Sequence, residues 1–148
     1  MGEDTQMTKI MIVDDEFDIR LVLTMPLEDS GYEVDQAVNG SEALANVRSI
    51  NPDLVLLDIN MPEMDGFQVL EQLKAFRDTA DIPVLMISAR SRPRDREDAL
   101  FMGAVDYITK PWSEGELELR VSWALAQSKP GGGVTGQIDT AAFTAALA

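Results

Sequence analysis

Five short apolar runs, separated by stretches with helical periodicity, constrain the fold of this 148-residue chain more than any other feature. The five expected strands cover residues 9–13, 34–38, 54–57, 83–87 and 105–109. Three of the runs are apolar throughout instead of alternating with polar residues, which is typical of strands buried on both faces. Because parallel strands are joined by right-handed connections, repeated strand–helix units fold into an open parallel sheet with helices on both faces. We therefore expect an α/β fold with a doubly wound, five-stranded parallel sheet.

Apolar side chains recur at spacings of three and four between the expected strands, which predicts five helices. These helices cover about residues 17–30, 41–50, 67–76, 95–102 and 113–127. Gly31 and Gly103 end the first and fourth helices, and Ser113 with Glu116 predicts a capping box at the start of the fifth. Pro26 lies inside the first helix, where it removes one backbone hydrogen bond and predicts a kink.

Composition divides the chain into one domain with a flanking segment on each side. We expect a folded domain over residues 8–128, preceded by a disordered N-terminal extension over residues 1–7. Residues 129–136 are rich in glycine, which predicts a flexible linker. Residues 137–148 are expected to form a short tail, which we interpret as the start of a truncated effector region.

The net charge and the missing residue types exclude several classes of function. With 12 basic and 26 acidic side chains the formal net charge is −14, and an acidic surface repels both nucleic acids and anionic membranes. The chain has no cysteine, which excludes disulfides and zinc–thiolate sites, and no histidine, which excludes a Ser-His-Asp triad. The absence of an 18-residue apolar run and of a signal-like start leads us to expect a cytoplasmic protein.

Polar side chains follow four of the expected strands at the point where each strand ends. They are Asp14, Asp15, Asp58, Ser88 and Lys110. The carboxyl ends of parallel strands meet at the sheet edge where doubly wound proteins bind ligands, so we expect these residues to lie together. Three carboxylates without histidine or cysteine suit a hard cation such as Mg²⁺, with Mn²⁺ as the alternative. Asp58 is best placed to act as a nucleophile while Lys110 and Ser88 hold an anionic group, which predicts phosphoryl transfer.

Four segments occur together in this chain in a fixed order: IMIVDDE, LVLLDINMPEMDG, VLMISAR and GAVDYITKPW. Over about residues 8–128 the chain resembles the receiver domain of bacterial two-component response regulators. The resemblance implies a flavodoxin-like receiver fold with strand order 2-1-3-4-5. It also implies a non-enzymatic signalling switch in which Asp58 takes a phosphoryl group from a sensor histidine kinase or a histidine phosphotransfer protein.

The same resemblance implies a role for each site residue. The Mg²⁺ ligands would be Asp14, Asp15, Asp58 and the backbone carbonyl of Asn60. Ser88 and Tyr107 would form a switch pair, Lys110 would contact the phosphoryl group, and the Lys110–Pro111 peptide bond would be cis. Phosphorylation would then change the surface formed by the fourth helix, fifth strand and fifth helix, over about residues 93–127.

Half of the arginines in the chain fall within one seven-residue segment: Arg90, Arg92, Arg94 and Arg96. This cluster predicts either a solvated loop or a contact patch for an acidic partner or a second copy. Acidic residues of the same expected surface are Asp106, Glu114, Glu116 and Glu118. Because opposite charges on one face allow a self-complementary pairing, we expect activation to favour a homodimer through this surface.

Two other functions stay open from the sequence. One is a receiver-like interaction module that acts without phosphorylation, which the loss of Asp58 or Lys110 would favour, although neither is lost. The other is a Mg²⁺-dependent aspartyl-phosphate phosphohydrolase, which would want a second aspartate two residues after the nucleophile, where Asn60 stands. Asp65 is the weakest candidate ligand among the acidic residues because a helix N-cap explains it fully.

Overall fold

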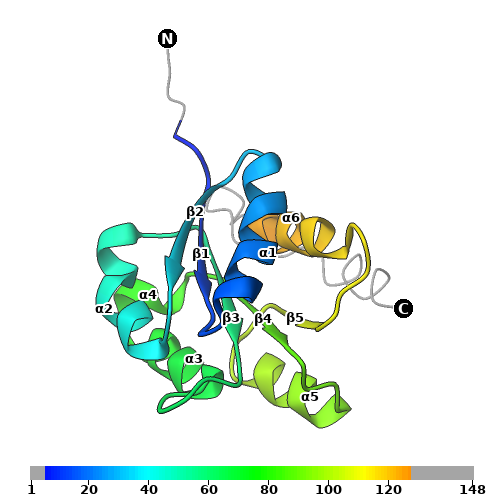
Figure 1. Ribbon diagram of the computed structural model, residues 1–148. Helices are drawn as coiled ribbons and strands as arrows, with labels where there is room; N and C mark the ends of the chain where they lie inside the picture. Colours follow the sequence, from blue (N-terminus) through cyan, green and yellow to red (C-terminus); the bar gives the residue numbers. More distant parts are fainter. Residues whose placement is uncertain (1–5, 128–148) are drawn as a thin grey trace.

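The computed structural model describes residues 6–127, which alternate between strands and helices along the chain (Figure 1). The strands are Lys9–Val13 (β1), Glu33–Ala37 (β2), Leu54–Asp58 (β3), Val84–Ser88 (β4) and Asp106–Thr109 (β5). The helices are Phe17–Asp29 (α1), Gly40–Ile50 (α2), Gly66–Ala75 (α3), Arg77–Ala80 (α4), Pro93–Phe101 (α5) and Glu116–Gln127 (α6). The expected linker and tail, and most of the expected N-terminal extension, lie outside the described residues.

The five strands form one parallel sheet in the order β2-β1-β3-β4-β5, which confirms the expected topology. Helices α1 and α6 cover one face of this sheet, and α2, α3 and α5 cover the other (Figure 1). Within β1, Met11 and Val13 belong to the core below α2 and α3, whereas Ile10 and Ile12 belong to the core below α1 and α6. In β1, β3 and β4 the run of apolar residues is therefore nearly unbroken, because each successive side chain enters a different core.

One short helix, α4, has no counterpart among the five expected helices. It is held by contacts outside its own four residues, since the Thr79 hydroxyl donates to the Leu73 carbonyl at 2.6 Å. Lys74 Nζ also donates to the carbonyls of Ala80 and Ile82, each at 2.9 Å. As a result, the expected fourth and fifth helices are α5 and α6 of the structure, and the expected switch surface is α5–β5–α6.

The expected start of the last helix was wrong by three residues. Gly115 adopts a positive φ of 82°, which the helical backbone excludes, so α6 begins at Glu116 and not at Ser113. One half of the expected capping box is present, because the Ser113 backbone N–H donates to Glu116 Oε1 at 2.9 Å. Helix α5 begins two residues earlier than expected, with Pro93 in its first turn, where the missing N–H costs nothing.

Helix α1 continues through Pro26 and ends at Asp29. The Ser30 N–H donates to the Pro26 carbonyl at 3.0 Å, so the proline still takes part in the last helical turn as an acceptor.

Among residues 6–127, no helix is both long enough and apolar enough to cross a membrane.

Candidate functional site

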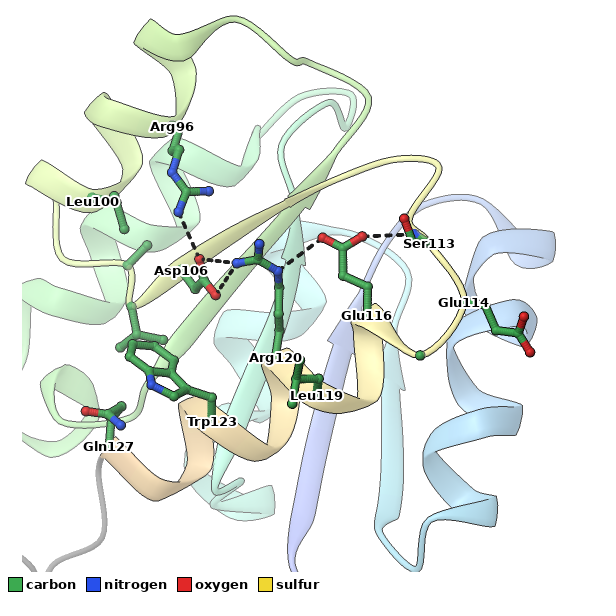
Figure 2. Close-up of a pocket in the computed structure, with 13 residues that line it drawn as sticks. Arg96, Leu100, Asp106, Ser113, Glu114, Glu116, Leu119, Arg120, Trp123 and Gln127 are labelled. Carbon is green, nitrogen blue, oxygen red and sulfur yellow. Dashed lines mark hydrogen bonds and ion pairs between the residues drawn. The ribbon is translucent and has the colours of Figure 1, made fainter. Parts of the chain in front are cut away.

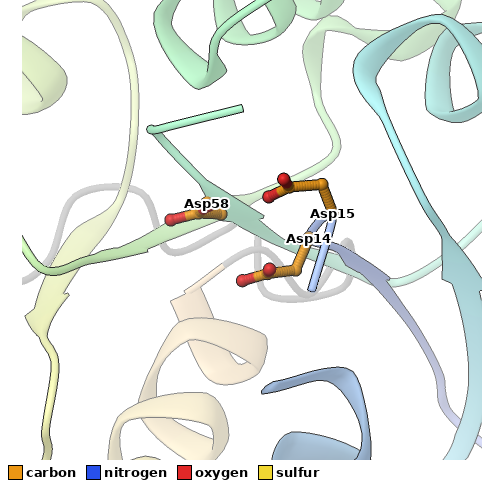
Figure 3. Close-up of side chains that lie close together, drawn as sticks. All are labelled: Asp14, Asp15 and Asp58. Atoms are coloured by element: carbon orange, nitrogen blue, oxygen red, sulfur yellow. The ribbon is translucent and has the colours of Figure 1, made fainter. Parts of the chain in front are cut away.

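The carboxyl edge of the sheet brings together all five residues that follow the expected strands. Asp14 and Asp15 follow β1, and Asp58 and Ser88 are the last residues of β3 and β4. Lys110 follows β5 and reaches back over the sheet edge to Asp14 and Asp58. Carboxylate oxygens of the three aspartates lie within 4.8 Å of one another, and the side chains extend toward the same space (Figure 3).

Asp14 is fully buried, and each of its polar atoms has a partner. Its backbone N–H donates to the Ala37 carbonyl of β2 at 3.2 Å, and its own carbonyl accepts from Arg20 Nη1 at 2.9 Å. In the side chain, Oδ1 accepts from the Glu16 N–H at 2.9 Å and Oδ2 accepts from Lys110 Nζ at 3.0 Å. Asp14 is therefore a fixed part of the site.

Asp15 differs from Asp14 in both burial and bonding. It is exposed, and it makes no hydrogen bond or ion pair with any residue in the range 6–127. Its carboxylate nevertheless belongs to the cluster with Asp14 and Asp58. Of the three carboxylates, Asp15 is thus the one whose oxygens are open to a ligand from solution.

Lys110 neutralises part of the negative charge of this cluster. Its ammonium lies 3.0 Å from Asp14 Oδ2 and 3.3 Å from Asp58 Oδ1. Burial alone lowers the pKa of Lys110, but the attraction of Asp58 and Asp14 outweighs it, so the net shift of the pKa is upward. The Lys110–Pro111 peptide bond is cis.

Asp58 is 4% exposed, and its environment favours the protonated form. Burial raises the pKa of Asp58 to about 6, and repulsion from Asp14 adds to the effect, while Lys110 opposes it. One lysine therefore does not balance three carboxylates. A divalent cation would relieve the remaining repulsion, and an all-oxygen donor set is what Mg²⁺ prefers, so these residues fit the expected metal.

The two residues expected to form the switch pair converge on the backbone of Arg90. Ser88 is buried, and its Oγ accepts from the Arg90 N–H at 3.1 Å. Tyr107 is 3% exposed, and its hydroxyl donates to the Arg90 carbonyl at 2.8 Å. Burial raises the pKa of the Tyr107 hydroxyl, with the nearby Ser88 hydroxyl acting in the opposite direction. Tyr107 is thus already turned inward in this structure.

The side chain of Arg90 bridges the loops that flank Asp58. Its Nε donates to Asn60 Oδ1 at 2.9 Å, and its guanidinium lies 5.9 Å from the centre of the Phe67 ring. A longer ion pair of 3.6 Å joins Arg90 to Asp95 at the start of α5. The side chain of Asn60 therefore contacts Arg90, and its backbone carbonyl as a metal ligand stays a prediction.

The arginine cluster is not one uniform charged patch. Arg92 pairs with the buried Asp95 at 3.1 Å, and Arg96 donates to the Tyr107 carbonyl at 3.0 Å. Of the four, Arg94 is exposed and makes no contact of this kind within the described part of the chain. Three of the four guanidinium groups are thus used to hold α5 and the loop before it.

Sequence reasoning missed a charged network around β5. Asp106 is buried and accepts from Arg120 at 2.7 Å and from Arg96 at 3.3 Å, and Arg120 also pairs with Glu116 (Figure 2). These residues line a groove of about 1430 Å³ between α5 and α6, together with the exposed Leu119. The charges expected to pair two copies are therefore largely paired within one.

Gly66 allows the start of α3 to approach the end of β3 closely. A Cβ at this position would lie 2.7 Å from the Ile59 Cα and closer still to the Asp58 carbonyl oxygen. The Gly66 N–H donates to the Ile59 carbonyl at 2.8 Å. Asp65 is the N-cap of α3, as expected, and it also forms a capping box with Gln68.

Several known proteins are similar to this chain in sequence or in fold. Residues 10–122 match the family model of the response regulator receiver domain. A probable transcriptional regulator ycf27 of Porphyra purpurea is 42% identical over 125 residues, which cover 84% of this chain and 50% of the relative. The transcriptional regulatory protein ResD of Bacillus subtilis is 40% identical over 126 residues, which cover 85% and 51%. This chain spans about half the length of these curated relatives.

A solved structure shows the same fold. The chemotaxis protein CheY4 of Vibrio cholerae superposes with a TM-score of 0.76 at 30% identity, and the match covers 80% of this chain and 99% of that protein. The family match extends over most of the described residues, from β1 to α6. On these grounds the chain belongs to the response regulator receiver domain family.

Proposed function

We propose that this chain is a non-enzymatic phosphoacceptor switch, in which Asp58 takes a phosphoryl group and the α5–β5–α6 surface passes the signal on. The observation that carries the proposal is the position of Asp58, a buried carboxylate held between Lys110 and two further carboxylates. In the transfer, one Asp58 carboxylate oxygen bonds to phosphorus while the bond from phosphorus to the donor's imidazole nitrogen breaks. The electron pair leaves with the imidazole, and a mixed anhydride forms on Asp58.

The metal proposed for this site is Mg²⁺, with Mn²⁺ as a substitute. Asp15, Asp14, Asp58 and the backbone carbonyl of Asn60 would hold it, with Asp15 offering the most accessible oxygens. When bound, the ion would neutralise charge on the phosphoryl oxygens and on the carboxylates. The Lys110 ammonium would contact the phosphoryl oxygens and neutralise part of their charge. It is placed to do so because it already contacts both Asp14 and Asp58.

The donor is proposed to be a phosphohistidine on another protein, either a sensor histidine kinase or a histidine phosphotransfer protein. The absence of histidine from this chain supports a donor supplied from elsewhere. A surface next to the site also suits a protein donor. Four exposed apolar side chains lie on α1, which starts directly after the acidic loop: Phe17, Leu21, Val22 and Met25.

The signal is proposed to pass from Ser88 through Tyr107 to α5–β5–α6. Ser88 Oγ accepts one hydrogen bond, so its own proton can be donated to a phosphoryl oxygen. A shift of Ser88 would act on the Arg90 backbone, to which Tyr107 is also bonded. The added phosphoryl charge is roughly −1.5 to −2, which is enough to bias such a pair. A homodimer through this surface is the proposed response.

The phosphohydrolase alternative has less support. Asn60 stands where a second catalytic carboxylate would be wanted, and its side chain oxygen is bonded to Arg90. An interaction module that works without phosphate would not need the paired Asp58 and Lys110, both of which are present and in contact.

The proposal is tested by phosphorylation with acetyl phosphate, followed by Phos-tag gels and intact mass. The wild-type chain should gain one phosphate with Mg²⁺ and none with EDTA. Asp58→Ala should gain none, whereas Asp65→Asn, which changes only a helix cap, should be labelled like the wild type. Labelling that survives Asp58→Ala would remove Asp58 as the acceptor.

A further inference from the structure

Arg20 is a buried cation next to the acidic cluster, and it forms no ion pair with a carboxylate of the described part of the chain. It is 9% exposed and lies on the side of α1 that faces the sheet, with Leu23 and Leu27. Among residues 6–127, no carboxylate oxygen lies within ion-pair distance of its guanidinium. Burying a charge without a counter-charge is energetically costly, so the position of Arg20 needs a reason.

The contacts of the guanidinium all go to neutral groups. Nη1 donates to the Asp14 carbonyl at 2.9 Å, Nε donates to Gln36 Oε1 of β2 at 3.0 Å, and the Phe17 ring lies 5.8 Å away. The Gln36 amide is oriented in turn, because its Nε2 donates to Thr24 Oγ1 at 3.1 Å. Arg20 therefore ties the acidic loop to α1 and to the edge strand β2.

The Asp14 carbonyl is half of the peptide unit that carries the Asp15 N–H. The peptide on the other side of Asp14 is also held, since the Asp14 N–H donates to Ala37 of β2. With Arg20 in place, both peptide planes around Asp14 are fixed. Asp15 has no partner of its own among the described residues, so the direction of its side chain depends on the backbone that Arg20 holds.

We propose that Arg20 is a positioning residue that sets the Asp14–Asp15 peptide and so aims the Asp15 carboxylate at a bound divalent cation. The inference rests on the metal site of the proposed function. The charge of Arg20 and its contact with Asp14 have opposite effects on the affinity of the site for a cation. Loss of a nearby positive charge, by itself, strengthens the binding of a cation, whereas loss of the Asp14 contact weakens it.

The test is a titration with MgCl₂ by isothermal titration calorimetry. Arg20→Gln should bind Mg²⁺ roughly 10-fold more weakly than the wild type, the usual size of effect for a group that orients a metal ligand. Arg20→Lys keeps the charge but cannot donate to Asp14 and Gln36 together with the geometry of a fork, so its affinity should fall between the two. Arg48→Gln is the matched control, because it removes the same charge from an exposed arginine paired with Asp78.

A merely structural role is excluded by two further measurements. The phosphorylation rate with acetyl phosphate should return close to the wild-type rate at saturating Mg²⁺, because Asp58 and Lys110 are unchanged. Thr24→Val keeps Arg20 and its charge but frees the Gln36 amide, so it should weaken Mg²⁺ binding in the same direction and by less. If Arg20→Gln does not fold, Mg²⁺ binding by Thr24→Val still tests the role of Arg20.

Unchanged or tighter Mg²⁺ binding in Arg20→Gln or Arg20→Lys, with a wild type that binds Mg²⁺, would overturn the role of Arg20 alone. A wild-type chain that binds no Mg²⁺ would instead remove the metal site of the proposed function, and this inference with it. A phosphorylation rate that stays low at saturating Mg²⁺ would also count against positioning of the metal ligand.

Discussion

Asp58 is a buried carboxylate beside two others, so its ionised form destabilises the fold when no cation is bound. Its folded-state pKa of about 6 lies above the ordinary value of 3.8 that describes an unfolded chain. The folded protein therefore holds this proton more tightly. The contribution of Asp58 to the free energy of unfolding falls as the pH rises from about 4 to about 6, and stays low above that.

In EDTA at pH 7.5, Asp58→Asn should be more stable than the wild type, by as much as about 3 kcal/mol at roughly 1.4 kcal/mol per pKa unit. Urea titrations at pH 7.5, 6 and 5 should show that this advantage shrinks as the pH falls, because the wild type becomes protonated. Asp98→Asn, at an exposed position on α5, should show no such trend. An advantage that is constant with pH would contradict the raised pKa of Asp58.

Lys110 is the cation shared by Asp14 and Asp58, so its removal should affect chemistry as well as charge. Lys110→Met should slow phosphorylation of Asp58 by acetyl phosphate by at least about 10-fold, which corresponds to about 1.4 kcal/mol of lost stabilisation. Time courses on Phos-tag gels at saturating Mg²⁺ measure this rate. Lys9→Met removes a lysine that bonds to Ile50, and it should leave the rate unchanged. Equal rates in Lys110→Met and the wild type would remove Lys110 from the reaction.

The sequence predicted the site residues at the strand ends, because each one follows an apolar run and the topology collects those ends at one edge. It did not predict the role of Arg20, nor that Asp106 is buried and paired within the chain, because the partners of both lie on other elements at no fixed spacing. An arginine three residues before Leu23, on the buried side of an amphipathic helix, was the one available signal for Arg20.

At the scale of elements, Gly66 fixes how closely α3 approaches the end of β3. Gly66→Ala should lower the free energy of unfolding by roughly 1–3 kcal/mol, the usual cost of overpacking, because the new methyl meets the backbone of Asp58 and Ile59. Urea denaturation measures the loss.

Gly40→Ala is the matched substitution at the start of α2, where the methyl meets side-chain atoms of Val69 and Met64 that can move. It should cost less than Gly66→Ala. If Gly40→Ala proves the more destabilising of the two, the backbone contact at Gly66 is not what demands glycine.

The central strands β1, β3 and β4 could be predicted to within about one residue because burial on both faces leaves a nearly unbroken apolar run. Helix α4 could not, since four residues are too few to show a period, and its stability comes from Thr79 and Lys74. The start of α6 was missed for another reason. A local serine–glutamate pattern competes with Gly115, whose positive φ is a property of the folded backbone.

At the scale of the whole molecule, the α5–β5–α6 surface exposes large apolar side chains, and the charges nearest to β5 are paired within the chain. Leu119 is 70% exposed and Phe101 is 92% exposed, while Asp106, Arg96 and Arg120 are paired within the chain. An activated dimer should therefore rely on the apolar groups and depend only weakly on salt.

Sedimentation velocity with beryllofluoride should show a dimer for the wild type at both low and high salt, and a monomer for Leu119→Asp. Leu119→Asp should still be phosphorylated, because Leu119 lies on α6 and outside the acidic cluster. Phe76→Asp, at an exposed apolar side chain between α3 and α4, is the control and should still dimerise. An activated wild type that stays monomeric would mean that a different protein reads this surface.

The two cores on the two faces of the sheet differ in tryptophan content, so tryptophan fluorescence reports on only one of them. Both tryptophans, Trp112 and Trp123, pack against the core layer of α1 and α6, whereas Tyr107 belongs to the layer of α2 and α3. Indole emission therefore reports on one layer, while circular dichroism averages over both. If the layers unfold as one cooperative unit, the two signals share a urea midpoint. A change in tryptophan emission at lower urea than the loss of the circular dichroism signal would mean that α1 and α6 separate from the sheet before the rest of the fold is lost.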